Sequence, residues 1–553
     1  MRTKSFLALL LLALPLFAAD VRKWSEDLAF VQREIETKHP HPWRRISQKD
    51  FEANVATLRK ELPKLSDEQV TVRLMAIVAS LRDGHTSLFP AEGCGFDTWF
   101  PIRFYEFTDG LFINAIDASH AELAGAKVTR IAALPSDKAL GRVKGIFSSD
   151  NELGAMEAAP LLASPRLLLG LGIVAAPDKL SLEVQTKDGK TSSIELAAVK
   201  GRSRFDWIHG AEMSGPVPGL VTPFGERNFF ALDGNPDLPL HLRFRGAYWF
   251  SWVEKPRLLY LQLNAMAEKS SYTPETFAAF LERAFTFADL HAVDKFVLDL
   301  RYDGGGNGRL INGIVHELIK RDRTVGRSGH LFVIGGRQTY SAGVGLLLAL
   351  REHTTAILAG EPVGAAINGS GDPDVATLPN SRYTLAISTN FSAAGNSRDA
   401  SWLIPVQLPA PFSSADYFGG KDPALDLILS PDAVSILETL STDGGEAAKA
   451  QYQRATARFA NYSWWDPFDR IRMNELGFHL LENGRAVDAL AAMELNVDRF
   501  PGSWETWDSL AEVLMGLKRN REAIDAYEKS LAISPDNWNN AAARKAIERM
   551  KKE

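Results

Sequence analysis

An alternation of strand-like and helix-like apolar patterns constrains the fold of this chain more than any other feature. Strand-like runs lie at 258–263, 295–301, 331–334 and 357–359, with a further run at 383–387. A helix with Phe277, Phe280 and Phe285 facing inward separates the first two runs, and Thr273, followed by Pro274, is expected to cap it. Strands that alternate with helices form largely parallel sheets with crossover connections. The sequence therefore predicts an α/β core over residues 201–430.

Two of the predicted strands lead into segments whose residues could form a functional site. The strand at 295–301 is followed by three consecutive glycines, Gly304–Gly306, and the strand at 331–334 is followed by Ser341. The separation of Gly305 and Ser341, 341 − 305 = 36 residues, fits one crossover unit. Parallel strands joined in this way end at the same edge of the sheet. The glycine amides and the serine hydroxyl are therefore expected to share one crevice.

Ser341 is expected at the N-terminus of a helix that includes the apolar run 344–350. Unpaired backbone N–H groups and the helix dipole favour negative charge at such a position. A hydroxyl nucleophile needs this environment, because its attack on a carbonyl creates an oxyanion. The alternative is that Ser341 only caps the helix, which is the commonest role of a serine there. A Walker-type phosphate loop is excluded because no Lys-Ser/Thr pair follows the glycines.

A third segment, Asp83-Gly84-His85-Thr86, follows a helix-period pattern that opens with a capping box from Ser66 to Gln69. A single histidine after a helix is usually a surface or cap residue. His85 therefore gains a functional interpretation only together with the other segments.

In this order, the segments resemble the serine peptidases of the C-terminal processing (tail-specific) and tricorn-core superfamily. The likeness extends over about residues 24–430 and includes these matching pieces: Asp83–Thr86, Val297–Arg301, Gly304–Gly306, Tyr340–Gly343, Gly360–Gly364, Asn368–Asp372 and Lys421–Leu425. The resemblance implies an α/β multidomain protein with a crotonase-like layered core. It also implies a helical N-terminal domain over 20–90 and a PDZ-like insert over 91–200, for which a plain β-rich insert is the alternative.

The resemblance also implies catalytic roles. Some members of the superfamily use a serine–lysine dyad, but no lysine occurs here between Lys320 and Lys421. The tricorn-like arrangement remains, with Ser341 as nucleophile and His85 as base.

The resemblance also implies which acid orients His85. In the tricorn-type pattern, this acid is a carboxylate six residues before a proline near the end of the core. Asp399 lies six residues before Pro405 and matches this position. Three other carboxylates remain as alternatives: Glu361, Asp372 and Asp83.

The oxyanion donors implied are the N–H of Ala342 and one from Gly304 or Gly305. Such chemistry requires no metal or cofactor. Two histidines, His39 and His41, lie close together, but the prolines between and after them favour a rigid turn over a metal site.

The first 19 residues have the form of an export signal. Arg2 and Lys4 supply the charged region, 6–17 the apolar region and Ala18-Ala19 the small residues before cleavage. The apolar run is too short for a comfortable membrane span, although an uncleaved anchor is the alternative. We therefore expect a secreted or periplasmic protein without stable membrane insertion. Its single cysteine, Cys94, leaves no internal disulfide, and the net charge of −6 without a basic run argues against nucleic acid as partner.

The C-terminal part repeats itself at a spacing of 34 residues. Three pairs show it: Leu476 and Leu510, Ala489 and Ala523, Trp504 and Trp538. This spacing is the tetratricopeptide period, so residues 471–553 are expected to form TPR-like helices after a helical linker at 431–470. A groove for a protein partner and a packed stabilising appendage are both consistent with it.

Three functions remain open at this point. The first is an exported serine peptidase that acts on a peptide or protein substrate. The second is another acyl hydrolase, an esterase or amidase, and the third is a scaffold that binds peptides or lipids without turnover. The intact Ser341, His85 and glycine run favour the two catalytic functions.

Overall fold

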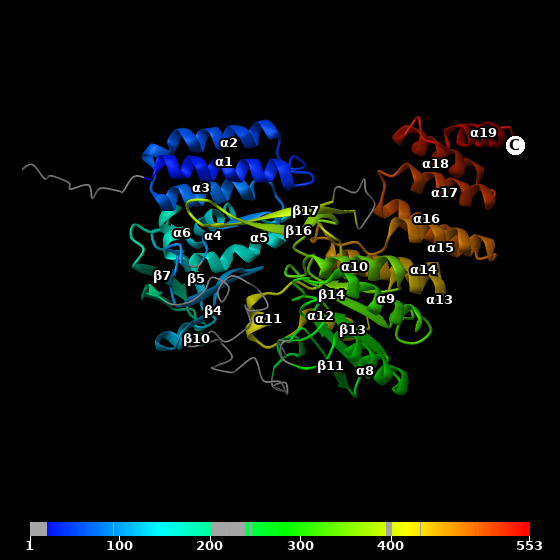
Figure 1. Ribbon diagram of the computed structural model, residues 1–553. Coiled ribbons are helices and arrows are strands. Elements are labelled where there is room, and N and C mark those ends of the chain that lie inside the picture. Colours follow the sequence, from blue (N-terminus) through cyan, green and yellow to red (C-terminus); the bar gives the residue numbers. More distant parts are fainter. Residues whose placement is uncertain are drawn as a thin grey trace, which may run out of the picture. The chain divides into compact units, whose positions relative to one another are not determined.

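The computed structural model describes residues 19–91, 93–200, 220–221, 238–243, 246–270, 273–393, 401–431 and 433–552 (Figure 1). The chain divides into two compact units, Met1–Arg227 with Asn368–Ala393, and Asn228–Ile367 with Ala394–Glu553. Apart from Ala19, the expected export signal lies outside the described residues. None of the helices within the described ranges combines the length and the apolar character needed to cross a membrane.

The first unit begins with helices α1 (Val21–Lys38), α2 (Gln48–Glu61) and α3 (Asp67–Ala79), with the short 3-10 helix η1 (Leu62–Lys64) before α3. Leu28, Val31 and Phe51 of these helices are almost completely buried. The capping box is confirmed. The Ser66 side chain accepts the Gln69 N–H, and the Gln69 side chain accepts the Ser66 N–H.

An antiparallel sheet follows, in the order β10-β4-β5-β7-β8, with β3 paired to β4 and β6 paired to β5. Its strands are β3 (Ile102–Phe107), β4 (Gly110–Asp117), β5 (Lys127–Ile131), β6 (Leu134–Pro135), β7 (Lys179–Gln185), β8 (Thr191–Ala197) and β10 (Leu220–Val221). The connections contain η2 (Ala118–Leu123), α4 (Ser136–Lys144), α5 (Glu152–Ala155), η3 (Met156–Ala163) and α6 (Pro165–Gly170), and β2 (Thr98–Trp99) pairs with β9 (Val199–Lys200). Gly189, at φ +82°, makes the tight turn between β7 and β8.

A second, three-stranded sheet has the order β1-β17-β16, from β1 (Ser87–Phe89), β17 (Thr384–Ala393) and β16 (Asn368–Thr377). The sequence predicted 383–387 as a continuation of the parallel core, and this is wrong. The segment lies in β17, which pairs antiparallel with β16 and β1 in the first unit. An alternating apolar pattern indicates a strand but does not say which sheet the strand joins.

The second unit is built on a six-stranded sheet in the order β11-β12-β13-β14-β15-β18. The strands are β11 (Tyr248–Val253), β12 (Leu258–Leu263), β13 (Lys295–Asp299), β14 (Leu331–Gly335), β15 (Ile357–Gly360) and β18 (Leu408–Pro409), preceded by η5 (Leu240–Leu242). Only β11 runs antiparallel to its neighbour among these six described strands. The largely parallel core predicted from the alternating patterns is therefore confirmed.

Helices cover both faces of this sheet, which is the usual arrangement for parallel strands (Figure 1). Leu259 and Leu261 of β12 point to one face, where α8 (Phe277–Leu290), η6 (Gly308–Leu310) with α9 (Ile311–Ile319), and α10 (Ala342–His353) pack. Leu258 and Tyr260 of the same strand point to the other face. There, α12 (Pro423–Leu429), α13 (Ile436–Thr442) and α14 (Gly445–Phe459) pack, after the short helix α11 (Ser414–Phe418).

The start of α8 differs from the prediction. Its N-cap is Thr276, whose hydroxyl accepts the Ala279 N–H, and not Thr273. Two threonines flank the Pro274-Glu275 pair, and the sequence pattern could not tell which one begins the helix. The inward face of α8 is as expected, with Phe277, Phe280 and Phe285 buried.

Five helices end the chain: α15 (Arg470–Glu482), α16 (Ala486–Arg499), α17 (Trp504–Gly516), α18 (Asn520–Ile533) and α19 (Asn540–Met550). The starts of α15 and α17, and of α16 and α18, are each 34 residues apart, which is the spacing of the sequence repeat. Arg472 of α15 donates to the carbonyls of Arg351 and Thr354 at the end of α10, so these helices are tied directly to the core of the second unit.

Candidate active site

Ser341 lies in a sharp turn between β14 and α10. Its backbone has φ +51° and ψ −122°, which is an uncommon and costly conformation for a residue with a side chain. Ser341 occupies the N-cap position, but its side chain makes no capping hydrogen bond. The interpretation of Ser341 as a side-chain cap is therefore wrong. A strained strand-to-helix turn of this kind exposes a hydroxyl at the positive end of a helix.

Two contacts hold this turn against the loop that follows β13. The Thr339 hydroxyl donates to the Leu300 carbonyl at 2.7 Å and accepts the Gly336 N–H at 3.0 Å. The Tyr340 N–H donates to the Asp303 carbonyl at 2.8 Å. The two loops that carry the glycines and the serine therefore lie side by side.

Glycine is required at the point of closest approach. Gly305 has φ +99°, and a Cβ there would lie 2.5 Å from the Ser341 Cβ and 2.9 Å from the Ala342 nitrogen. Gly343 is constrained in the same way, since its Cβ would lie 2.7 Å from the Asp303 carbonyl oxygen. Any side chain at Gly305 would displace the serine. The glycine run can therefore pack against the serine turn only because this position is glycine.

The amides of this loop do not all face a ligand. The Gly304 N–H donates to the Asn264 carbonyl at 3.3 Å, and the Gly305 N–H donates to Asp303 Oδ1 at 2.9 Å. The expected oxyanion donors Gly304 and Gly305 thus already have acceptors within the protein. The N–H groups of Gly306 and Ala342 have no acceptor among the described residues.

Asp303 is a residue of this site that the sequence analysis missed. Its side chain is completely buried, and burial raises the pKa of its carboxyl group to about 8, although the bond from the Gly305 N–H lowers it. Asp303 is therefore neutral at pH 7. The carboxyl group was visible in the sequence next to the glycines, but its burial was not.

We expect Asp303→Asn to stabilise the protein in a pH-dependent way. The wild-type carboxyl binds its proton up to about pH 8 when folded but loses it near pH 4 when unfolded, so it lowers the free energy of unfolding progressively between these values. Because one pKa unit is worth about 1.4 kcal/mol, the variant should gain several kcal/mol at pH 8 and almost nothing at pH 4. Urea unfolding at both pH values measures this, with the exposed Asp322→Asn as control. A gain that is equal at both pH values would contradict the burial of Asp303.

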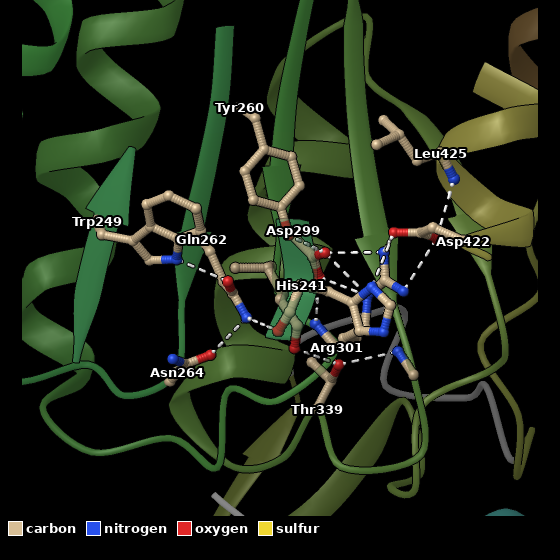
Figure 2. Close-up of polar contacts among 12 residues, drawn as sticks. His241, Trp249, Tyr260, Gln262, Asn264, Asp299, Arg301, Thr339, Asp422 and Leu425 are labelled. Carbon is tan, nitrogen blue, oxygen red and sulfur yellow. Dashed lines mark hydrogen bonds and ion pairs between the residues drawn. The ribbon is translucent and has the colours of Figure 1, made fainter. Parts of the chain in front are cut away.

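A buried polar cluster anchors the strand that leads to the glycine loop (Figure 2). Arg301 donates to both oxygens of Asp422, at 3.1 and 2.9 Å, and its Nε lies 2.8 Å from Asp299 Oδ2. The Tyr260 hydroxyl donates to the same Asp299 oxygen at 2.6 Å, and His241 Nδ1 lies 3.2 Å from Asp422. Burial raises the pKa of Asp422, but the contacts with Arg301 and His241 together outweigh this effect and lower the pKa. The Val297–Arg301 and Lys421–Leu425 motifs therefore meet in one structural anchor.

His85 belongs to the first unit, whereas Ser341 belongs to the second. The segment that carries His85 joins α3 to β1, and Arg82, at φ +51°, makes the turn. Strand β1 then pairs with β17. His85 is thus held between a helix and a three-stranded sheet.

Asp83 fixes the backbone of this segment. Its Oδ2 accepts hydrogen bonds from His39 Nε2 at 2.8 Å, Thr86 Oγ1 at 2.8 Å and Ser388 Oγ at 2.7 Å, and its Oδ1 accepts the His85 N–H at 3.0 Å. Burial raises the pKa of Asp83, but these bonds outweigh it and lower the pKa to about 2. Asp83 is therefore ionised, and it holds the main chain of His85.

His39 is part of this arrangement. Its Nδ1 accepts the His41 N–H at 3.1 Å, so its proton lies on Nε2, which donates to Asp83. No group of three or more metal-ligating side chains occurs in the described part of the chain. Ser388 was not singled out from the sequence and His39 was expected only in a rigid turn, because nothing in the sequence shows that the two converge on Asp83.

The His85 ring contacts the β16–β17 hairpin. It is hydrogen-bonded to the Ser370 backbone, and a Cβ on Gly371 would lie 3.9 Å from its Nε2. Burial lowers the pKa of His85, while the charges of Asp83 and Asp372 raise it by less. The imidazole is therefore neutral at pH 7, as a general base must be.

The four candidate carboxylates lie in different places. Asp83 and Asp372 lie in the same unit as His85 and act on its charge. Glu361 lies in the second unit, where it pairs with Arg337 at 3.4 Å. Asp399 lies outside the described residues.

Comparison with known proteins gives a fold and no sequence relative. No family model matches the chain, and no curated protein matches it. Mature CPAF matches with a TM-score of 0.53 and 11% identity, over 77% of this chain and 98% of that chain. CPAF complexed with lactacystin matches with a TM-score of 0.50 and 10% identity, over 78% and 99%. The photosystem II D1 C-terminal processing protease covers 72% and 98% at 14% identity, with a TM-score of only 0.32.

The chain therefore has the multidomain α/β fold of CPAF. The multidomain α/β fold that the resemblance implies is thus confirmed.

Proposed function

We propose that this chain is an exported serine peptidase with a Ser-His-acid arrangement of the tricorn type. Ser341 is the nucleophile and His85 is the general base. The observation that carries the proposal is the strained turn at Ser341, whose hydroxyl makes no capping hydrogen bond at the helix N-terminus and whose Cβ lies against Gly305. The fold it shares with CPAF supports the same assignment.

The reaction is acyl transfer. His85 takes the proton from the Ser341 hydroxyl as the oxygen attacks the peptide carbonyl and forms a C–O bond. The same proton then passes to the leaving amine, and the C–N bond breaks to give an acyl-enzyme. Water, deprotonated by His85, hydrolyses the ester and restores the serine. The neutral state of His85 supports this role, because a protonated imidazole accepts no further proton.

Oxyanion stabilisation is assigned to backbone amides. The Ala342 N–H lies at the start of α10, directly after the nucleophile, and has no acceptor among the described residues. A second donor comes from the glycine loop, where Gly306 rather than Gly304 or Gly305 has an N–H without a described acceptor. Each such donor contributes about 10²–10³ in rate.

The orienting acid remains Asp399 in this proposal, on the strength of its position before Pro405. The contacts of His85 offer an alternative in which the Ser370 backbone orients the ring and Asp372 contributes negative potential. The variants Asp399→Asn and Asp372→Asn separate the two assignments. Replacing Asp399 should lower kcat strongly only if Asp399 orients the ring.

The remaining features of the proposal come from the sequence. They are export through residues 1–19 to the periplasm or beyond, a crotonase-like core, a PDZ-like insert over 91–200 and TPR-like helices over 471–553. The substrate class is a peptide or protein, and no cofactor is required.

A substrate comparison tests the proposed activity. We expect the mature chain to cleave members of a peptide library, and Ser341→Ala to cleave none. A panel of p-nitrophenyl esters of increasing acyl length is the parallel arm. Hydrolysis of esters without cleavage of any peptide would contradict the peptidase and identify an esterase. Absence of both activities in folded protein would identify a scaffold.

A further inference from the structure

Two carboxylates on α17 are partly removed from water and have the properties of a cation-binding site. Asp508 and Glu512 are four residues apart on this helix and therefore lie on the same face. Asp508 is only 6% exposed. Its Oδ2 accepts a hydrogen bond from Asn539 Nδ2 at 2.5 Å, whereas its Oδ1 has no partner among the described residues.

The charges of these two groups are not compensated by an ion pair. Neither of them takes part in any ion pair recorded within the described ranges. Burial raises the pKa of Asp508, and burial together with the charge of Asp508 raises the pKa of Glu512. Burial and the charges of the same two carboxylates raise the pKa of nearby Tyr527 of α18. The charge of Arg549 of α19 acts on Tyr527, but its guanidinium donates to Met515 Sδ at 3.0 Å. Carboxylates removed from water are normally paired with a cation.

Two tryptophans lie beside these carboxylates. Trp504 precedes Asp508 by four residues on α17, so Trp504, Asp508 and Glu512 form one stripe along the helix. Trp538 adjoins Asn539, the residue bonded to Asp508, and its ring lies 5.7 Å from the Trp504 ring in an edge-to-face arrangement. Trp538 is 84% exposed, which is unusual for so large an apolar side chain.

We propose that this stripe, Trp504, Asp508 and Glu512 together with Trp538, binds a lysine or arginine side chain of a protein partner. The indole rings contact the aliphatic stem and attract the positive charge, and the carboxylates receive the charged head. Four residues of helix span about 6 Å, which matches the length of a lysine stem. The site lies on the terminal helices and does not depend on the proposed peptidase activity.

A binding titration tests this proposal with the full mature chain in the Ser341→Ala background, so that the probe is not cleaved. The probe is a fluorescein-labelled tetralysine peptide, followed by anisotropy, and a tetra-arginine peptide is the second arm. We expect Asp508→Asn with Glu512→Gln to weaken binding at least about 10-fold, and Trp538→Ala to weaken it about 5-fold.

The matched control is Asp525→Asn with Glu482→Gln, which removes the same charge from two exposed positions. It should change binding by less than about 2-fold, because general attraction to an acidic surface is weak and screened. Acetylation of the probe lysines should abolish binding. Equal losses in both double variants, undiminished binding of the acetylated probe, or no binding of either peptide at millimolar concentration would overturn the proposal.

Discussion

Replacing Ser341 by alanine is expected to lower kcat for a peptide substrate by about 10⁴–10⁶-fold, which is the usual effect of removing a serine nucleophile. The fold should remain intact, because the hydroxyl makes no capping hydrogen bond. A genuine serine cap would lose about 1 kcal/mol. Steady-state kinetics and thermal unfolding of the purified variant measure both quantities.

A glycine at the same position provides a matched variant. Ser341→Gly also lacks the hydroxyl and should be equally inactive, but glycine adopts φ +51° without strain. We therefore expect Ser341→Gly to be more stable than Ser341→Ala by about 1 kcal/mol. An alanine variant that keeps more than a tenth of wild-type activity, or that unfolds at a much lower temperature, would contradict the assignment of Ser341.

Replacing His85 by glutamine is expected to lower kcat by about as much as the loss of the nucleophile, since a serine and its base act as a unit. The wild-type pH profile provides an independent check. Only neutral imidazole accepts the serine proton, so kcat/KM should fall as the pH drops through the pKa of His85. Because burial lowers this pKa, the midpoint of the acid limb should lie below 6.5.

His120→Gln serves as the control, because His120 lies in the same unit outside the network around Asp83. Its activity and pH profile should match those of the wild type. A His85→Gln variant with near-normal kcat would rule out His85 as the base, and an acid limb centred above 6.5 would contradict the buried environment found here.

The local features of the site were predictable because each depends on neighbouring residues. The capping box of Ser66 and Gln69, the inward face of α8 and the turn at Ser341 all follow from short-range patterns. The adjacency of Gly305 and Ser341 also followed, since parallel strands end at one edge of a sheet.

Features that depend on contacts between distant segments were not predictable. Strand β17 of the β16–β17 hairpin pairs with β1 instead of extending the parallel core. The paired residues are about 300 positions apart in the chain. Asp83 likewise accepts hydrogen bonds from His39 and Ser388, which lie in separate segments of the chain. The donation of the Gly305 N–H to Asp303, and the burial that raises the pKa of Asp303, are consequences of packing that no sequence pattern records.

Covalent labelling with a fluorophosphonate tests the central claim most directly, because this reagent reacts only with a serine activated by a base. Intact-mass and peptide mapping should find one adduct on Ser341 in the wild-type protein, and none in Ser341→Ala or His85→Gln. An unlabelled wild-type protein with a native thermal transition, or labelling of Ser341 that persists at the wild-type rate in His85→Gln, would contradict the account.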